Sequence, residues 1–348
     1  MNTAGTNRVC SRCLELKDTV VGRTDESGVT LPPLHPRCRC AIMYRELKEQ
    51  PKPKPNKTPE NQLLNPSGNE RDEAVSAPKY PKGFIPAKTI KEANTFAVNV
   101  LKISQAEYKG CALEVANEWN YGLFETFKRF PEIRKKFGFV GEAYERNALC
   151  ENALTDYFYT ILEVNFPKFD REYLKQQAQK HASRVIIDEM KIERNTCTQS
   201  MTSKHPVKRL FVGVTINRET GRNYRQFLEM LKQGVKIKRH PVGCDTVKSV
   251  LDHEVGHQLD DLLGLRYMPE VQRIFDELVV IKNGVEDFSR ITEGLSRYAW
   301  DNDNKNRYAE FIAEAWAKYC NNPSPREIAQ KLGAIVEREY AKKYPRGD

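Results

Sequence analysis

The stretch Thr246–Leu263, TVKSVLDHEVGHQLDDLL, is the part of the chain that decides the fold. Its apolar residues recur at spacings of three and four, which predicts a helix with one buried face. Within it, His253, Glu254 and His257 form the pattern His-Glu-x-x-His. Two histidines four residues apart project from the same face of a helix, so both imidazoles can bind one metal ion. Glu254 then lies beside that ion, where it can accept a proton from a water. The alternative is a core helix that happens to hold two histidines.

A third ligand is needed, because a catalytic zinc site typically has three protein ligands and a water. Asp260, on the same helix, is one candidate. A second predicted helix, Tyr308–Tyr319 (YAEFIAEAWAKY), offers Glu310 and Glu314 beside an apolar stripe. Two glutamates on an amphipathic helix usually form a solvated acidic edge. With the histidine helix about fifty residues upstream, we expect a ligand helix instead.

The segments HEVGHQLDDLLG, EGLSRYA and YAEFIAEAW together resemble the catalytic domain of anthrax lethal factor and its relatives, a group of zincin metallopeptidases. The match is closest over the C-terminal part of the chain. The resemblance implies an α+β, zincin-like metallopeptidase fold that is mainly helical, with a small mixed sheet and an active-site helix carrying the His-Glu-x-x-His pattern. It also implies that the chain hydrolyses peptide bonds.

The resemblance assigns the family's catalytic residues to positions of this sequence: zinc ligands His253, His257 and Glu310, general base Glu254, and the oxyanion-stabilising tyrosine Tyr298. The segment Trp300–Arg307 lengthens the gap between that tyrosine and the ligand helix, which leaves Tyr308 as a rival. Asp260 would then hold a histidine ring in orientation. Glu314 is an alternative acidic ligand.

Residues 84–348 are predicted to form one α+β domain. Helices are predicted at Thr89–Leu101, Ala112–Phe130, Ala143–Leu162, Arg171–Ala182 and Asn223–Lys232, and strands at Arg184–Ile192 and Lys208–Asn217. In zincins an edge strand over the metal binds extended substrate through backbone hydrogen bonds. The resemblance suggests that Phe211–Asn217 has this role, with substrate contacts from Phe211, Val212, Gly213, Val214 and Thr215. The alternative is a strand paired deeper in the sheet.

Residues 1–47 contain a second possible metal site. Cys10 and Cys13 form Cys-x-x-Cys, and the motif PPLHPRCRC follows with His35, Cys38 and Cys40. This pattern predicts a zinc knuckle in which Cys10, Cys13, His35 and Cys38 bind a structural zinc ion, with Cys40 as an alternative ligand or spare thiol. A segment of about forty residues has too small a core to fold unaided, so a metal is physically reasonable. The alternative is a cysteine-rich loop.

The same motif is similar to the C-terminal tail of Mu-type phage head morphogenesis proteins, which are minor head proteins found near the portal. The larger helical region that precedes the tail in such proteins is missing here, which suggests a fragment, an internal start or a split gene product. Residues 48–83 are rich in proline and lysine and are predicted to be a linker. The predicted domains are therefore a zinc-knuckle tail (1–47), this linker (48–83) and the metallopeptidase domain (84–348).

The chain has 56 lysines and arginines against 47 aspartates and glutamates, a net charge of +9. The basic N-terminal segment could contact nucleic acid. No aromatic residues interleave with its charges, so a solvated linker is the simpler interpretation. The sequence contains no run of eighteen apolar residues, so no membrane span is predicted. The start, MNTAGTNRVCSRC, lacks the apolar segment of a signal peptide. The predicted location is the cytoplasm of a producing host cell or the phage virion.

These observations together predict a zinc-dependent metalloendopeptidase of phage or prophage origin with one catalytic and one structural zinc ion. Its predicted partners are a protein or peptide substrate and phage head or portal proteins, with no membrane. Two other interpretations stay open. One is a catalytically silent structural minor head protein, and the other is a toxin effector delivered by a phage.

Overall fold

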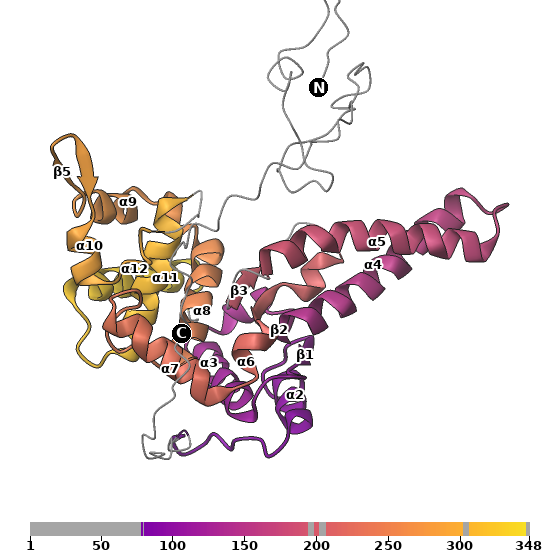
Figure 1. Ribbon diagram of the computed structural model, residues 1–348, viewed down its shortest axis with the longest axis horizontal. Helices are drawn as coiled ribbons and strands as arrows, with labels where there is room; N and C mark the ends of the chain where they lie inside the picture. Colours follow the sequence, from indigo (N-terminus) through magenta and orange to yellow (C-terminus); the bar gives the residue numbers. More distant parts are fainter. Residues whose placement is uncertain (1–77, 79, 194–197, 202–206, 302–305, 346–348) are drawn as a thin grey trace, which may run out of the picture. The chain divides into compact units, whose positions relative to one another are not determined.

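The computed structural model describes residues 78, 80–193, 198–201, 207–301 and 306–345. The chain divides into two units, Met1–Asp72 and Glu73–Asp348, and every described residue belongs to the second. The predicted zinc knuckle, with Cys10, Cys13, His35, Cys38 and Cys40, lies outside the described residues. The described part is mostly helical with a small sheet, as predicted (Figure 1).

The described helices are α2 (Ile90–Asn99), α3 (Leu113–Arg129), α4 (Ala143–Asn165), α5 (Arg171–Glu193), α6 (Arg218–Gly221), α7 (Tyr224–Lys236), α8 (Val247–Leu263), α9 (Pro269–Asp276), α10 (Ser289–Gly294), α11 (Arg307–Asn321) and α12 (Glu327–Lys343). Short 3-10 helices are η1 (Pro131–Lys136), η2 (Lys208–Phe211) and η3 (Leu265–Tyr267). The strands are β1 (Gln105–Glu107), β2 (Phe139–Glu142), β3 (Thr198–Met201), β4 (Gly213–Ile216), β5 (Val280–Lys282) and β6 (Val285–Asp287).

The main sheet is mixed and has the strand order β1-β2-β4-β3. β1 pairs with β2, and β2 with β4, in parallel, with Val140 opposite Val214. β3 runs antiparallel to β4, with Ser200 opposite Val214. β4 is therefore an inner strand, and β1 and β3 are the edges. A separate hairpin joins β5 to β6 through Asn283 and Gly284, which both have positive φ, as this two-residue turn requires.

Two strand predictions are wrong in part or in full. Arg184–Ile192 is not a strand, because α5 continues through it to Glu193. Ile186 is buried in the core that α4 and α5 form beside the sheet, and this packing overrides the β-propensity of the Val-Ile-Ile sequence. In Lys208–Asn217, only Gly213–Ile216 forms a strand, and the first part is the 3-10 helix η2.

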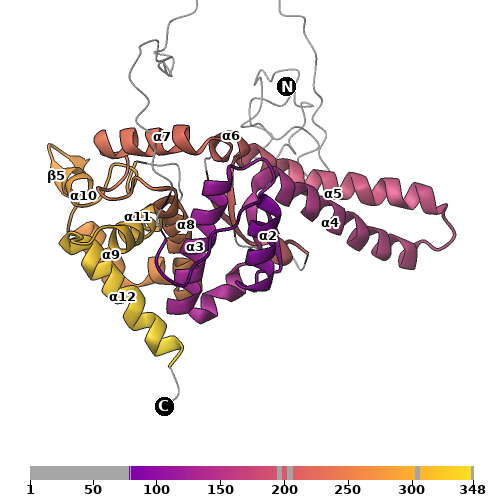
Figure 2. The ribbon, with the colours of Figure 1, turned by 90° about the horizontal axis from the view of Figure 1, so that it is seen from below.

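Helix α8 lies at the centre of the main core (Figure 2). It packs against α3, α7, α11 and α12 and against strands β3 and β4. Fully buried side chains along it, Leu251, Val255 and Leu259, belong to the same core as Trp119 and Phe311. The central position means that any side chain on the exposed edge of α8 is held on a rigid support.

A smaller core lies between the sheet and the antiparallel pair α4–α5, which extends away from the helices around α8 (Figure 1). At the far end of this pair, Phe166 and Phe169 are exposed. No helix in the described part of the chain is long and apolar enough to cross a membrane.

Candidate metal centre

Both ends of helix α8 are fixed by local sequence. The hydroxyl oxygen of Thr246 accepts a hydrogen bond from the Ser249 backbone N–H at 3.1 Å. The Ser249 hydroxyl oxygen accepts from the Thr246 backbone N–H at 3.3 Å, which completes a capping box. Gly264 ends the helix in the left-handed conformation, with φ of 71°, which glycine adopts at little cost. His253 and His257 therefore lie well inside the helix, one turn apart.

Helix α11 packs against α8 at very short range, because small residues face each other. Gly256 lies next to Ala313 and Trp316, and a β-carbon at position 256 would lie 2.8 Å from Cα of Ala313. Gly256 directly precedes His257, and Ala313 directly precedes Glu314. The close approach at these two residues therefore brings the glutamates of α11 onto the histidines of α8.

Three potential ligand atoms meet at this contact. Nε2 of His253 lies 3.2 Å from Oε2 of Glu310, and Nε2 of His257 lies 3.3 Å from the same oxygen. The two Nε2 atoms are 3.2 Å apart. The three atoms form a nearly equilateral triangle. Within the described part of the chain, these residues are a group of histidine and acidic side chains close enough to hold one metal ion.

Glu314, one turn after Glu310, fixes the orientation of one histidine. Its Oε1 lies 2.8 Å from Nδ1 of His253, a distance at which a protonated Nδ1 donates to the carboxylate. Its Oε2 accepts a hydrogen bond from the hydroxyl of Ser296, and both residues are buried. A proton on Nδ1 would leave the lone pair of Nε2 available to a metal ion in the triangle.

The charges of the site favour a cation at its centre. Burial opposes ionisation of Glu310, but its contacts with His253 and His257 bring the pKa of this carboxyl well below its usual range. Burial likewise opposes protonation of His253, while Glu310 and Glu314 raise the pKa of its imidazole well above its usual value. The two carboxylates thus create a negative environment that a positive charge between the ligand atoms would neutralise.

Tyr298 lies beside the triangle, whereas Tyr308 does not. The ring of Tyr298 is 5.9 Å from that of His253 between centroids. Burial, together with the charges of Glu310, Glu254 and Glu314, raises the pKa of Tyr298, so its hydroxyl keeps its proton. Tyr308 packs on Phe275, and its hydroxyl lies 3.5 Å from the carboxylate of Asp276. Of the two rivals predicted from the sequence, Tyr298 is the one near the histidines.

Glu254 is buried at 4% exposure, and its charge acts on Tyr298, which indicates that it faces the same space. Asp260, which was predicted to orient a histidine ring, makes its hydrogen bonds with Arg266. Its carboxylate accepts hydrogen bonds from the backbone N–H of Arg266 at 2.8 Å and from the Arg266 guanidinium at 2.5 Å. Glu314, on α11, is an acidic residue whose carboxylate lies within hydrogen-bonding distance of a histidine ring nitrogen, Nδ1 of His253.

The prediction that an edge strand binds substrate through Phe211, Val212, Gly213, Val214 and Thr215 is wrong, because these residues do not form an edge strand. β4 is paired on both sides, so its backbone has no free edge for a peptide. It supports the site instead: the side-chain amide of Gln258 on α8 donates to the carbonyl of Gly213 at 3.2 Å. Of the two alternatives drawn from the sequence, the strand deeper in the sheet is the one observed.

Sequence reasoning missed Ser296 and His240, which lie near the histidines. Ser296 stands two residues before Tyr298, within the EGLSRYA segment already singled out. His240 lies in the loop between α7 and α8, and its ring is 6.3 Å from that of Tyr298 between centroids. Its solitary position in the sequence gave no spacing signal.

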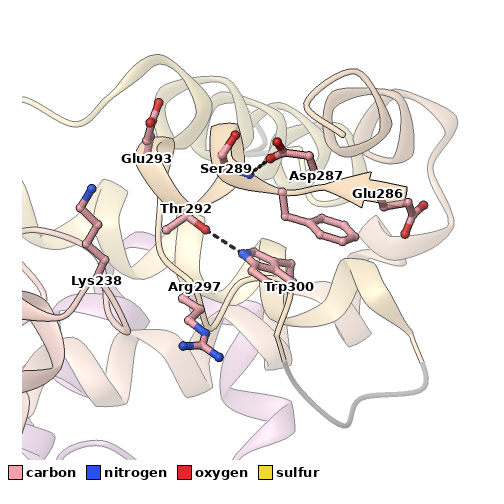
Figure 3. A pocket seen from close by; sticks show the side chains of 9 residues that line it. Lys238, Glu286, Asp287, Ser289, Thr292, Glu293, Arg297 and Trp300 are labelled. Atoms are coloured by element: carbon pink, nitrogen blue, oxygen red, sulfur yellow. Dashed lines mark hydrogen bonds between the residues drawn. The ribbon is translucent and has the colours of Figure 1, made fainter. Parts of the chain in front are cut away.

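A pocket is lined by residues of the β6–α10 region, by Lys238 and by Arg297 and Trp300 (Figure 3). Its lining includes two basic residues, Lys238 and Arg297, and three acidic ones, Glu286, Asp287 and Glu293. Trp300 and Phe288 stack with a centroid distance of 4.6 Å, and the Trp300 indole N–H donates to Thr292 at 2.8 Å. Arg297, one of the residues that line this pocket, directly precedes Tyr298.

Comparison with protein-family models, with curated proteins and with solved structures finds no match.

Proposed function

We propose that this chain is a zinc-dependent metallopeptidase of the zincin type, similar to the catalytic domain of lethal factor. The observation that supports this most directly is the triangle formed by Nε2 of His253, Nε2 of His257 and Oε2 of Glu310, with edges of 3.2 to 3.3 Å. Zinc binds nitrogen and oxygen ligands at about 2.0–2.1 Å, so two ligands of a tetrahedral site are about 3.3 Å apart. The donor set and its spacing therefore fit zinc without rearrangement.

Zinc at this site would supply Lewis acidity toward a water molecule and a peptide carbonyl. Glu254 is then the general base: its carboxylate accepts a proton from the attacking water and delivers it to the nitrogen of the leaving amine. The Tyr298 hydroxyl, held in its protonated form, donates a hydrogen bond to the carbonyl oxygen as negative charge develops there. Glu314 keeps Nδ1 of His253 protonated, and Ser296 holds Glu314 in place.

The substrate strand is better assigned to β3 than to β4. β3 (Thr198–Met201) is an edge of the main sheet, runs antiparallel to β4 and packs against α8. Within the described part of the chain, one side of its backbone has no strand partner, so an extended peptide could pair there and bind along α8 through backbone hydrogen bonds.

The remaining features of the proposal rest on the sequence of the N-terminal segment. Its similarity to the tail of phage head morphogenesis proteins supports a phage or prophage origin, a structural zinc ion on Cys10, Cys13, His35 and Cys38, and phage head or portal proteins as partners. The action of the peptidase would then take place in the producing cell or in the virion.

The test compares the full chain with Glu254→Gln on a peptide library, with cleavage products identified by mass spectrometry. We expect the wild type to cleave and Glu254→Gln to show no cleavage above background, while metal analysis gives the same zinc content for both. Glu277→Gln, an exposed glutamate at the end of α9, is the matched control and should cleave like the wild type. Equal rates for Glu254→Gln and the wild type would exclude the proposed general base. A zinc-loaded wild type that cleaves nothing would count against the peptidase.

A further inference from the structure

The loop between α7 and α8 is joined to the segment that carries Tyr298. The backbone N–H of Arg297 donates to the carbonyl of Lys238 at 2.7 Å, and the N–H of Tyr298 donates to the carbonyl of Arg239 at 3.2 Å. These two consecutive hydrogen bonds fix the two segments against each other. The residue that follows Arg239 is His240, so its imidazole is held next to the Tyr298 ring, which in turn lies beside His253.

The His240 ring rests on a glycine of the preceding helix. A β-carbon at Gly234, in the last turn of α7, would overlap Cδ2 of His240 and lie 3.1 Å from its Nε2. The backbone N–H of His240 also donates to the carbonyl of Gly234 at 3.2 Å. Gly234 itself is buried, so the ring cannot be accommodated there if any side chain is present. The backbone and the glycine together hold the imidazole in one place.

His240 lies near the potential metal ligands without belonging to their group. Among the described residues, the group able to share one metal ion consists of His253, His257 and Glu310 and does not include His240. Burial lowers the pKa of His240, opposed by the charge of Glu314, so the imidazole is uncharged at neutral pH. A neutral imidazole carries one N–H, and such a group can polarise a carbonyl by donating a hydrogen bond to it.

We propose that His240 is a second hydrogen-bond donor, next to Tyr298, to the carbonyl oxygen of the peptide bond that is cleaved. This inference rests on the proposed function, because it concerns the same reaction. Two donors from two linked segments would hold the developing oxyanion in a fixed position, as preorganised donors do in other acyl-transfer sites. The link between Lys238–Arg239 and Arg297–Tyr298 explains how both donors keep a constant spacing.

The test measures kcat and KM for His240→Ala and His240→Gln on a peptide that the wild type cleaves and Glu254→Gln does not. We expect His240→Ala to lose at least about tenfold in kcat, with KM changed by less than about twofold, since the interaction strengthens in the transition state. His240→Gln keeps an N–H donor and should recover part of the loss. His181→Ala, an exposed histidine on α5, is the matched control and should leave both constants unchanged.

Two further measurements separate this role from structural ones. Zinc content should be the same in His240→Ala and the wild type, and a phosphinic peptide built on the cleaved sequence should bind His240→Ala at least about tenfold more weakly by calorimetry. Gly234→Ala should lower kcat through the displaced ring, and Gly234→Ala combined with His240→Ala should be no slower than His240→Ala alone.

The outcomes are distinct. A His240→Ala enzyme within about threefold of the wild type in kcat, or one that has lost its zinc, overturns the role of His240 and leaves the peptidase assignment intact. A zinc-loaded wild type with no cleavage removes the proposed function and this inference with it. A loss in kcat with zinc retained, weaker phosphinate binding and partial recovery by glutamine supports both.

Discussion

Gly256 on α8 lies directly against the backbone of Ala313 on α11, with 2.8 Å between Cα of Ala313 and the place of a β-carbon at position 256. Helices normally pack 8–10 Å apart depending on the side chains between them, and the shortest distances need the smallest residues. Gly256 precedes a candidate ligand of α8, His257, and Ala313 follows one of α11, Glu310. The geometry of the candidate metal centre is therefore set by a contact that involves none of its potential ligand atoms.

Gly256→Ala should destabilise the protein, although alanine is the better helix former by roughly 1 kcal/mol. The added methyl has no space, and overpacking typically costs about 1–3 kcal/mol. Urea unfolding should show this loss, and titration with zinc should show weaker binding because α11 is pushed away. A variant that is as stable as the wild type would mean that α8 and α11 are not in close contact.

The second prediction concerns the zinc content of the chain and its effect on stability. We expect the full chain to carry two zinc ions, one at the α8–α11 site and one in the N-terminal segment. His257→Ala should lose the first and Cys13→Ser the second, as measured by metal analysis. Zinc added to the metal-free chain should raise its Tm, since a ligand at a thousandfold its Kd stabilises by about 4 kcal/mol. His257→Ala should lack the part of this rise that the first site contributes. A zinc content that neither variant changes would contradict both assignments.

Glu314→Gln tests how the orientation of a ligand affects metal binding. The carboxylate lies 2.8 Å from Nδ1 of His253, and loss of such a supporting group typically weakens metal binding by about 10- to 100-fold. Competition with a zinc chelator should measure this. Ser296→Ala, which removes only the hydrogen bond to Glu314, should have a smaller effect in the same direction. If Glu314→Gln abolished binding as completely as His253→Ala, Glu314 would be acting as a ligand.

The sequence predicts the parts of this site that depend on local periodicity. The helical spacing of His253 and His257, and of Glu310 and Glu314, follows from short-range pattern alone. Each helix also has a small residue directly before the second member of its pair: Gly256 before His257, and Ala313 before Glu314. The choice between Glu310 and Glu314 does not follow from periodicity, because both lie on the same face of α11.

The rest of the fold depends on long-range packing that periodicity does not encode. The Val-Ile-Ile sequence at 185–187 has strand propensity but lies in α5, where Ile186 packs in the core beside α4. The position of β4 inside the sheet depends on β3 adding to its other side. His240 reaches the site only because its loop pairs with the Tyr298 segment, which is more than fifty residues away in the sequence. These contacts join distant parts of the chain.

Lys318 gives a prediction for the dependence of stability on pH. Its side chain is buried at 2% exposure and donates to the carbonyl of Gly294 at 2.8 Å. Burial, with a smaller contribution from Arg326, lowers the pKa of Lys318 below that of the unfolded chain. The folded state therefore releases this proton at lower pH than the unfolded state, so the group's contribution becomes more favourable as pH rises from the folded to the unfolded pKa.

The measurement compares the free energy of unfolding of the wild type and Lys318→Met by urea at pH 7 and at pH 10. The free energy of unfolding of the wild type, relative to that of Lys318→Met, should be higher at pH 10 than at pH 7. Lys331→Met, an exposed lysine on α12, should show no such change. Parallel pH dependences for the wild type and Lys318→Met would show that the ammonium is as well solvated in the folded chain as in the unfolded one.

Tyr298 and Tyr308 offer the sharpest comparison within the site. Loss of one donor to a developing oxyanion typically lowers kcat by about 10²- to 10³-fold. Tyr298→Phe removes only the hydroxyl of the tyrosine beside His253, so it should lower kcat by this amount, with KM little changed and zinc content the same. Tyr308→Phe removes an equivalent hydroxyl that faces Asp276, and it should cleave like the wild type. If the two variants were reversed, with Tyr308→Phe slow and Tyr298→Phe normal, α11 would have to turn Tyr308 toward the histidines during the reaction. In that case the arrangement around Tyr298, including the role of His240, would not be the one that stabilises the transition state.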